Sequence, residues 1–191
     1  MLLQKAGSMN FVLAGLVPQS KDDAPAWEKK HLTGAYDNVF ATIYQGLDTH
    51  IHTTQESGTI PEFEIYDAGM INNIAYFKKQ RILKCPIYLQ FVLGIQDGLP
   101  VWVDNLVFLR NIAKKQLDEF NWSCAAAGRH QFPVITTAMA MGGNARMPPY
   151  SAGRSLSWNG FTLLDDGLPS TIRNPHPRAP QETAAALIQA S

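Results

Sequence analysis

Two pairs of polar residues are the first candidates for chemistry. Ser8 and Asn10 lie two positions apart, as do Glu62 and Glu64. Side chains at this spacing point to one face of a β-strand, so each pair would act on one side of its sheet. The hydroxyl of Ser8 and the amide of Asn10 can bind a carboxylate or keto oxygen. The alternative interpretation is structural: the first pair satisfies backbone groups at a strand end, and the glutamates are solvated edge charges.

Two arginines are candidates for binding anions. Arg129 follows a run of small residues, and Arg146 follows a Gly-Gly pair. A planar guanidinium matches the oxygens of a phosphate, which makes Arg129 a candidate phosphate ligand. Either arginine could instead pair with a structural carboxylate.

A histidine pair and two cysteines raise the question of metal binding. His50-Ile51-His52 matches the sequence pattern of a zinc-binding His-x-His pair. Such a pair binds zinc well only on a strand, where both rings share a side and a third ligand converges. Here we predict a helix end, so we expect two surface histidines. Cys85 and Cys124 are too few for a disulfide framework and predict reduced thiols of a cytoplasmic protein.

Composition excludes several classes of partner. The chain has 191 residues, and its 16 basic and 16 acidic side chains cancel. No basic stripe is present to neutralise a nucleic-acid backbone. Apolar stretches such as 87–95 are too short to span a bilayer, and the N-terminus has no apolar core of signal-peptide length. We expect a single cytoplasmic domain that binds small molecules, without nucleic-acid or membrane partners.

The elements that position these residues alternate between strand and helix patterns. Predicted strands cover 62–67, 87–94 and 122–128. Predicted helices cover 37–49 and 70–83. A third predicted helix is capped by Asp104, and a fourth has Pro133 at its first position and stops at Gly142-Gly143.

The alternation of strands and helices indicates an α/β fold with parallel strands. Rossmann-like sheets and (β/α)8 barrels both fit. No Gly-x-Gly-x-x-Gly follows a strand, and a complete barrel needs about 250 residues, so an incomplete barrel is one interpretation.

Two segments have no clear period. The polar stretch 19–32 is long for a connector, and such loops often cover active sites in α/β folds. Residues 147–181 hold six of the twelve prolines, which predicts irregular structure.

Four segments, read together, resemble the β-keto acid cleavage enzymes, also called 3-keto-5-aminohexanoate cleavage enzymes. The first three are Gly7–Phe11, Pro61–Gly69 and Leu89–Gly94, and the fourth comprises Trp122-Ser123, Ala127–Gln131 and Gly142–Arg146. Their order and spacing match the family over residues 5–146. The resemblance implies a (β/α)8 TIM barrel in which this chain supplies strands four to eight.

The resemblance also implies a reaction and a site. A β-keto acid and acetyl-CoA would give a new CoA thioester and acetoacetate, with zinc polarising the keto oxygen. Barrel active sites lie at the C-terminal strand ends. The matching positions make Glu64 and Arg146 the candidate catalytic residues. Ser8, Asn10 and Arg129 become candidate substrate-binding residues, with Arg129 placed for a CoA phosphate.

The chain departs from the family at the metal. The resemblance implies an early His-x-His strand, which is missing here. After Arg146 the family continues Val-Gly-Leu-Glu-Asp, and its glutamate is the third zinc ligand, whereas this chain has Met147-Pro148-Pro149-Tyr150-Ser151. We therefore expect no metal ligands. The expected organisation is a partial-barrel domain over residues 1–146 and a divergent, irregular tail over 147–191.

Three interpretations of function remain open. The first is a truncated member of the family, without activity as an isolated chain. The second is a non-catalytic partial barrel that acts as a subunit, as a homo-oligomer or with a complementary chain. The third is another α/β-barrel lyase that binds its substrate without metal.

Overall fold

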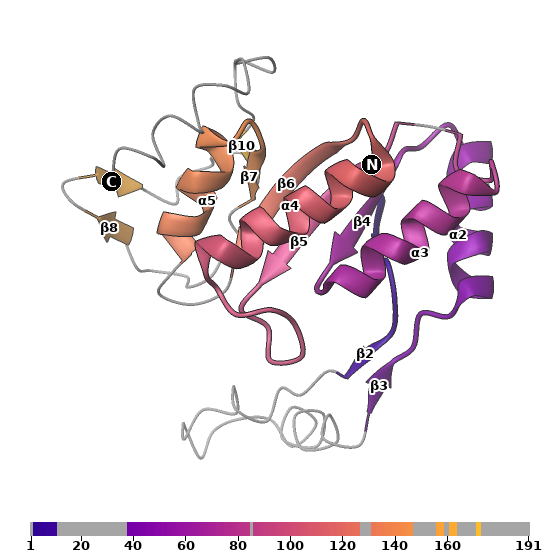
Figure 1. Cartoon of the computed structure of the whole chain (residues 1–191), viewed down its shortest axis with the longest axis horizontal. Helices are drawn as coiled ribbons and strands as arrows, with labels where there is room; N and C mark the ends of the chain where they lie inside the picture. Colours follow the sequence, from indigo (N-terminus) through magenta and orange to yellow (C-terminus); the bar gives the residue numbers. More distant parts are fainter. Residues whose placement is uncertain are drawn as a thin grey trace.

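The computed structural model describes residues 2–10, 38–84, 86–126 and 131–146, and the backbone of 156–158, 161–163 and 171–172. The main sheet contains β1 (Leu2–Lys5), β4 (Pro61–Ile65), β5 (Tyr88–Leu93), β6 (Asn121–Ala126), β7 (Asn144–Arg146) and β10 (Thr171–Ile172), in that spatial order (Figure 1). Two small antiparallel sheets join β2 (Met9–Asn10) to β3 (Val39–Phe40), and β8 (Leu156–Trp158) to β9 (Phe161–Leu163).

The strand order separates the two folds that the sequence left open. Strands β1, β4, β5, β6 and β7 run parallel, and each new strand pairs with the preceding strand of this series. A doubly wound sheet reverses its strand order at a switch point, whereas a barrel does not. The sheet is therefore consistent with an arc of a (β/α)8 barrel. Its numbering as strands four to eight stays a prediction.

Helices connect the parallel strands and cover one face of the sheet. They are α2 (Tyr44–Glu56), α3 (Ala68–Lys79), α4 (Val103–Leu117) and α5 (Gln131–Ala140). Asp67 is the N-cap of helix α3, and its side chain accepts a hydrogen bond from Met70 N at 3.1 Å. The helix ends with Lys78 and Lys79, whose positive charges interact favourably with the negative end of the helix dipole. Helices α3 and α4 lie side by side over the sheet (Figure 1).

One core lies between these helices and the sheet. The strands contribute Phe63 and Ile65 of β4 and Leu89 and Phe91 of β5, which stand at alternate positions and are separated by Glu64 and Gln90. Each helix adds buried residues, including Leu47 and Ile51 from α2, Ile71 and Ile74 from α3, Leu106 and Leu109 from α4, and Val134 and Ala138 from α5. The alternation therefore places apolar side chains toward the helices and polar side chains on the opposite face.

The three predicted strands are confirmed as β4, β5 and β6, with ends that differ by up to two residues. Ala127 and Gly128 lie outside the described residues, as do Arg129 and the predicted loop 19–32. The division at residue 146 stays a prediction. Within the predicted irregular tail, the described backbone forms β8, β9 and β10, and β10 pairs antiparallel with β7.

The helix predicted over 37–49 is wrong in position. Val39 and Phe40 have helical spacing with later apolar residues, but they form β3 and pair with β2. Their side chains are exposed, whereas Leu47 and Ile51 of α2 are buried. The apolar period therefore starts later than we predicted, because tertiary pairing decides the conformation of the first residues.

Two helix starts also differ from prediction. Asp104 lies in the first turn of α4, where its negative charge interacts favourably with the positive end of the helix dipole. The N-cap residue is Trp102 instead. Pro133 is the third residue of α5, still within the turn that lacks backbone partners. The predicted stop is confirmed, because α5 ends at Ala140 and Gly142 follows with a φ of 83°.

The prediction that Ser8 and Asn10 share one strand is wrong. The chain bends after β1, Ser8 lies between the two strands, and Asn10 belongs to β2 in a separate sheet. Two short strands replace one because β2 leaves the main sheet to pair with β3.

Candidate functional site

A row of polar residues crosses the sheet on the side away from the helices. The strand registers pair Lys5 with Glu64, Glu64 with Gln90, Gln90 with Ser123, and Ser123 with Asn144. Residues at paired positions of parallel strands share a face. We define the polar face by Lys5, Glu62, Glu64, Gln90, Ser123, Asn144 and Arg146. Lys5 and Arg146 end their strands, so the face reaches the carboxyl edge of the sheet, where α/β proteins bind ligands.

Arg146 is held by a hydrogen-bond network that spans four strands. Its Nη1 donates to Gln90 Oε1 at 2.8 Å. Gln90 Nε2 donates to Glu62 Oε1 at 3.3 Å and to Ser123 Oγ at 3.4 Å, and Ser123 Oγ donates to Glu62 Oε1 at 3.2 Å. Gln90 is only 2% exposed. The glutamine therefore links the arginine of β7 to the carboxylate of β4.

Glu64 lies beside this network and carries a perturbed carboxyl. Burial raises its pKa, although a hydrogen bond from Tyr66 and the charges of Lys5 and Arg146 oppose the shift. The Tyr66 hydroxyl donates to Glu64 Oε2 at 3.2 Å. Burial and the carboxylate raise the pKa of Tyr66 as well. A half-buried acid between two cations suits proton transfer.

Ser8 and Asn10 both make protein contacts near this edge. Ser8 Oγ accepts a hydrogen bond from Thr42 N at 2.9 Å, which ties the segment after β1 to the start of α2. Asn10 donates through its backbone N to Asp97 Oδ2 at 2.5 Å and through Nδ2 to Asp97 Oδ1 at 3.3 Å. Asp97 lies in the loop after β5, so these contacts connect β2 to that loop. Their role in substrate binding stays a prediction.

The structure brings together some of the predicted residues and adds others. Glu64 and Arg146 share the polar face, and Arg129 lies outside the described residues. Sequence reasoning missed Lys5, Gln90 and Asp97 as site residues. Gln90 had a signal, because it is a polar residue inside an otherwise apolar strand. Asp97 had none, since its partner is 87 positions away.

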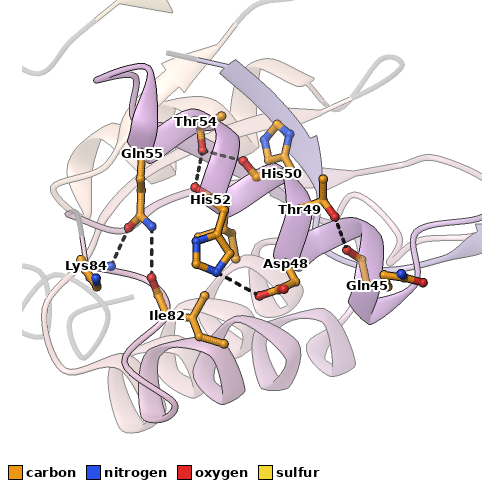
Figure 2. A network of polar contacts seen from close by, with 10 residues as sticks. Gln45, Asp48, Thr49, His50, His52, Thr54, Gln55, Ile82 and Lys84 are labelled. Atoms are coloured by element: carbon orange, nitrogen blue, oxygen red, sulfur yellow. Dashed lines mark hydrogen bonds and ion pairs between the residues drawn. The ribbon is translucent and has the colours of Figure 1, made fainter.

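The zinc implied by the resemblance finds no matching donor set in the part of the chain described. No three His, Cys, Asp or Glu side chains gather there. His50 and His52 lie within α2 rather than at its end, and their rings diverge (Figure 2). His52 Nε2 lies 3.6 Å from Asp48 Oδ1, whereas His50 points away from that pair (Figure 2). A helix rotates about 100° per residue, so this spacing cannot converge on one ion.

Helix α2 is anchored by polar contacts that have no role in the polar face. Gln55 Nε2 donates to Ile82 O at 3.1 Å, and Lys84 N donates to Gln55 Oε1 at 2.7 Å (Figure 2). Thr54 Oγ1 donates to His50 O at 2.8 Å. The histidine region is therefore a structural helix tied to the segment after α3.

A sequential parallel sheet with polar residues at its carboxyl edge defines an α/β protein, and it is consistent with part of a barrel that carries a candidate active site at this edge. The model of the beta-keto acid cleavage enzyme family matches residues 1–147, so the chain belongs to this family. Among the described residues, no helix is long and apolar enough to cross a membrane.

Curated relatives carry related names. The 3,5-dioxohexanoate:acetyl-CoA acetone transferase of Paraburkholderia graminis is 32% identical over 142 residues, 74% of this chain and 46% of the relative. The 3-keto-5-aminohexanoate cleavage enzyme of Fusobacterium nucleatum is 35% identical over 111 residues, 58% of this chain and 39% of the relative. The 3-oxoadipate:acetyl-CoA acetyltransferase of Cupriavidus necator is 27% identical over 86 residues, 45% of this chain and 30% of the relative. The chain thus spans less than half the length of these relatives.

Proposed function

We propose that this chain provides a β-keto acid binding site of the cleavage-enzyme type. The family reaction would convert a β-keto acid and acetyl-CoA into a new CoA thioester and acetoacetate. The names of the relatives support this substrate class, since they include a keto or dioxo acid and acetyl-CoA. The observation that carries the proposal is the Arg146–Gln90 hydrogen bond at the carboxyl edge of the sheet.

The proposal assigns a role to each of the five candidate site residues. The Arg146 guanidinium pairs with the substrate carboxylate, because among the described residues Gln90 engages only its Nη1. Glu64 moves a proton at the reacting carbon or oxygen, since burial raises the pKa of its carboxyl above the ordinary value of a glutamate. Ser8 and Asn10 border the substrate, and Arg129 binds a phosphate of acetyl-CoA.

Zinc has no assigned ligand among the residues that the structure describes. The resemblance implies a metal that would polarise the keto oxygen. The described donor set does not fit it, because the two helix histidines diverge and no third ligand joins them. We propose that the isolated chain binds no stoichiometric zinc. The tasks given to Arg146 and Glu64 do not depend on one.

Titration of the chain with acetoacetate, followed by backbone amide NMR, tests the binding proposal. We expect saturable shifts at Gln90, Ser123 and Asn144, which lie on the polar face. Shifts confined to the helices, or none at millimolar ligand, would overturn the proposal. A parallel titration with acetyl-CoA tests the second ligand.

A second candidate function is a structural subunit that pairs with a complementary chain. Among the described residues, no strand pairs with the outer edge of β1. Its Leu2 and Leu3 are 50% and 38% exposed, and Ile43, which lines the same groove as Gln4, is also exposed. Edges of parallel sheets are normally paired or covered.

A groove beside this edge favours the same function. It is an open, shallow groove of about 590 Å³, lined by residues of β1 and α2 that include Gln4, Gly46 and His50. The buried His50 Nε2 has no hydrogen-bond partner among the described residues. The occupant would be a chain that adds a parallel strand to β1. Sedimentation of the purified chain should show self-association, and a monodisperse monomer with a sharp melt would contradict this subunit proposal.

A further inference from the structure

The two oxygens of the Glu64 carboxyl have different surroundings. Oε2 accepts the hydrogen bond from the Tyr66 hydroxyl at 3.2 Å, whereas no hydrogen bond to Oε1 comes from the described residues. Lys5 and Arg146 act on the carboxyl through their charges. The difference between the two oxygens therefore comes from Tyr66.

Tyr66 is held in place by contacts that do not involve Glu64. It is the first residue after β4, at the carboxyl edge of the sheet, and it is only 5% exposed. Its backbone N donates to Met70 Sδ at 3.4 Å, and its carbonyl accepts a hydrogen bond from Leu99 N at 3.1 Å. A Cβ added at Gly98 would lie 3.2 Å from that carbonyl and 3.5 Å from Cδ1 of the ring. Helix α3 and the loop after β5 thus restrict both the backbone and the ring.

The loop after β5 is itself closed and anchored. Gly94 N donates to Leu99 O at 2.8 Å, which closes the loop. Asp97 within it accepts the two hydrogen bonds from Asn10 of β2. One loop therefore supports Asn10 through Asp97 and Tyr66 through Leu99.

The Tyr66 hydroxyl remains a donor while Glu64 titrates. Burial raises the pKa of the phenol, and the charge of the carboxylate adds to this shift. A donor aimed at Oε2 favours the ionised carboxylate, so it opposes the rise in the Glu64 pKa that burial causes. When Glu64 is protonated, its proton resides on Oε1, because Oε2 already accepts the phenol proton.

We propose that Tyr66 is the positioning residue of Glu64: its hydroxyl holds Oε2 and leaves Oε1 to exchange a proton with a bound β-keto acid. The inference rests on the proton-transfer role proposed above for Glu64. The lone pair of Oε1 takes a proton from the carbon between the carboxylate and keto groups. The electrons of the broken C–H bond form the enolate, and the reverse transfer returns the proton. Tyr66 keeps its own proton throughout.

Titration of the Glu64 carboxyl in the full chain tests this role. Carboxyl-carbon NMR of the isotope-labelled chain follows Glu64, whose signal is assigned by its loss in Glu64→Gln. Tyr66→Phe keeps the ring and removes the hydroxyl. The Glu64 pKa should then move upward, because burial remains and the opposing hydrogen bond is lost. A merely structural role would admit water and move the pKa downward, so a downward or absent shift would overturn the proposal.

Tyr44→Phe is the matched control. It removes a hydroxyl that donates to Asn73 Oδ1 at 2.8 Å, between helices α2 and α3 rather than on the polar face. The Glu64 pKa should be unchanged in this variant. An equal upward shift in both variants would overturn the assignment to Tyr66.

The pH dependence of acetoacetate binding connects this titration to the substrate. An anionic ligand beside Glu64 binds more tightly while the carboxyl is protonated, so its Kd should rise as the pH passes through the Glu64 pKa. In Tyr66→Phe the midpoint of this rise should move upward together with the NMR titration. A Kd midpoint that stays in place while the carboxyl pKa moves would overturn the role of Tyr66 in substrate chemistry.

The outcomes separate this proposal from the binding proposal. Saturable binding on the polar face with an unchanged Glu64 pKa in Tyr66→Phe would leave the β-keto acid site standing and overturn the role of Tyr66. Absence of binding would overturn the proposed function and the proton exchange with it, while the NMR titration still shows whether the hydroxyl holds Glu64. If Tyr66→Phe fails to fold by circular dichroism, the Tyr66 Cζ signal of the natural chain should titrate with the midpoint of Glu64. A Cζ signal that does not follow Glu64 would overturn the proposal.

Discussion

Arg146 Nη1 donates a hydrogen bond to Gln90 Oε1 at 2.8 Å, and this bond joins β7 to β5 across the intervening β6. The orientation of the Gln90 amide follows from its other contacts, because its Nε2 faces the acceptor oxygens of Glu62 and Ser123. Its oxygen is thereby presented to the arginine. A buried amide thus fixes the direction of a cation at the carboxyl edge of the sheet.

Replacement of Gln90 should therefore disorder Arg146 and weaken acetoacetate binding. A hydrogen bond to a charged group contributes about 1.5–3 kcal/mol, so Gln90→Leu should raise the Kd at least roughly tenfold. Gln116→Leu is the matched control, because Gln116 is an exposed residue of α4 that bonds to Asn72. Calorimetric titration of both variants gives the comparison. Equal affinities for the two would mean that Gln90 does not position the arginine.

The Glu64→Gln variant should change the pH dependence of stability. Burial raises the folded-state pKa of Glu64 above its unfolded value, so the folded chain binds this proton more tightly. This contribution is present below the unfolded pKa and is lost as the pH rises through the folded pKa. Glutamine does not titrate, so the variant does not lose this stability as the pH rises. The Tm of the variant minus that of the natural chain should therefore increase between pH 4 and pH 8. A constant or opposite difference would show that Lys5 and Arg146 outweigh burial.

Gly143 should be intolerant of a side chain. A Cβ there would lie 2.6 Å from the Trp122 ring, which packs against Phe91. Gly143→Ala should destabilise the fold by about 1–3 kcal/mol through overpacking. Gly46→Ala is the control, because the residue is inside α2 and, apart from the backbone of its own helix, no described atom lies within 4 Å of the added Cβ. It should stabilise by up to ~1 kcal/mol. Denaturant melts that rank the two variants in the reverse order would contradict the packing.

Elemental analysis of the purified chain should find well under one zinc per chain. The expectation rests on the divergence of His50 and His52 along α2. Stoichiometric zinc that disappears in the His50→Ala and His52→Ala variants would show that these histidines do bind metal. Stoichiometric zinc that survives both changes would place the ligands elsewhere.

The sequence predicted the strands better than the segments that join them. Strands β4, β5 and β6 have continuous or alternating apolar patterns, so local spacing was sufficient. The segment before α2 was misassigned, because Val39 and Phe40 form β3 through pairing with residues about 30 positions earlier. The chain also bends after β1, so Ser8 and Asn10 do not share one strand. Contacts of this range are not encoded in local periodicity.

The site was predicted in part. Glu64 and Arg146 were identified through motifs and lie on one face, where they act electrostatically on each other. Lys5 and Gln90 were missed, because their importance depends on the register between strands. Lys5 becomes a neighbour of Glu64 only when β1 pairs with β4. Strand register follows from tertiary packing and could not be deduced from one sequence.

The most direct test of the central claim is the affinity of the Arg146→Gln variant for acetoacetate. Our account predicts a Kd at least roughly tenfold higher than that of the natural chain, because a charge-assisted pair with the carboxylate is lost. Arg110→Gln, which changes an arginine of α4 on the opposite side of the sheet, should bind as the natural chain does. Unchanged affinity in Arg146→Gln, or an equal loss in Arg110→Gln, would contradict a β-keto acid site on the polar face.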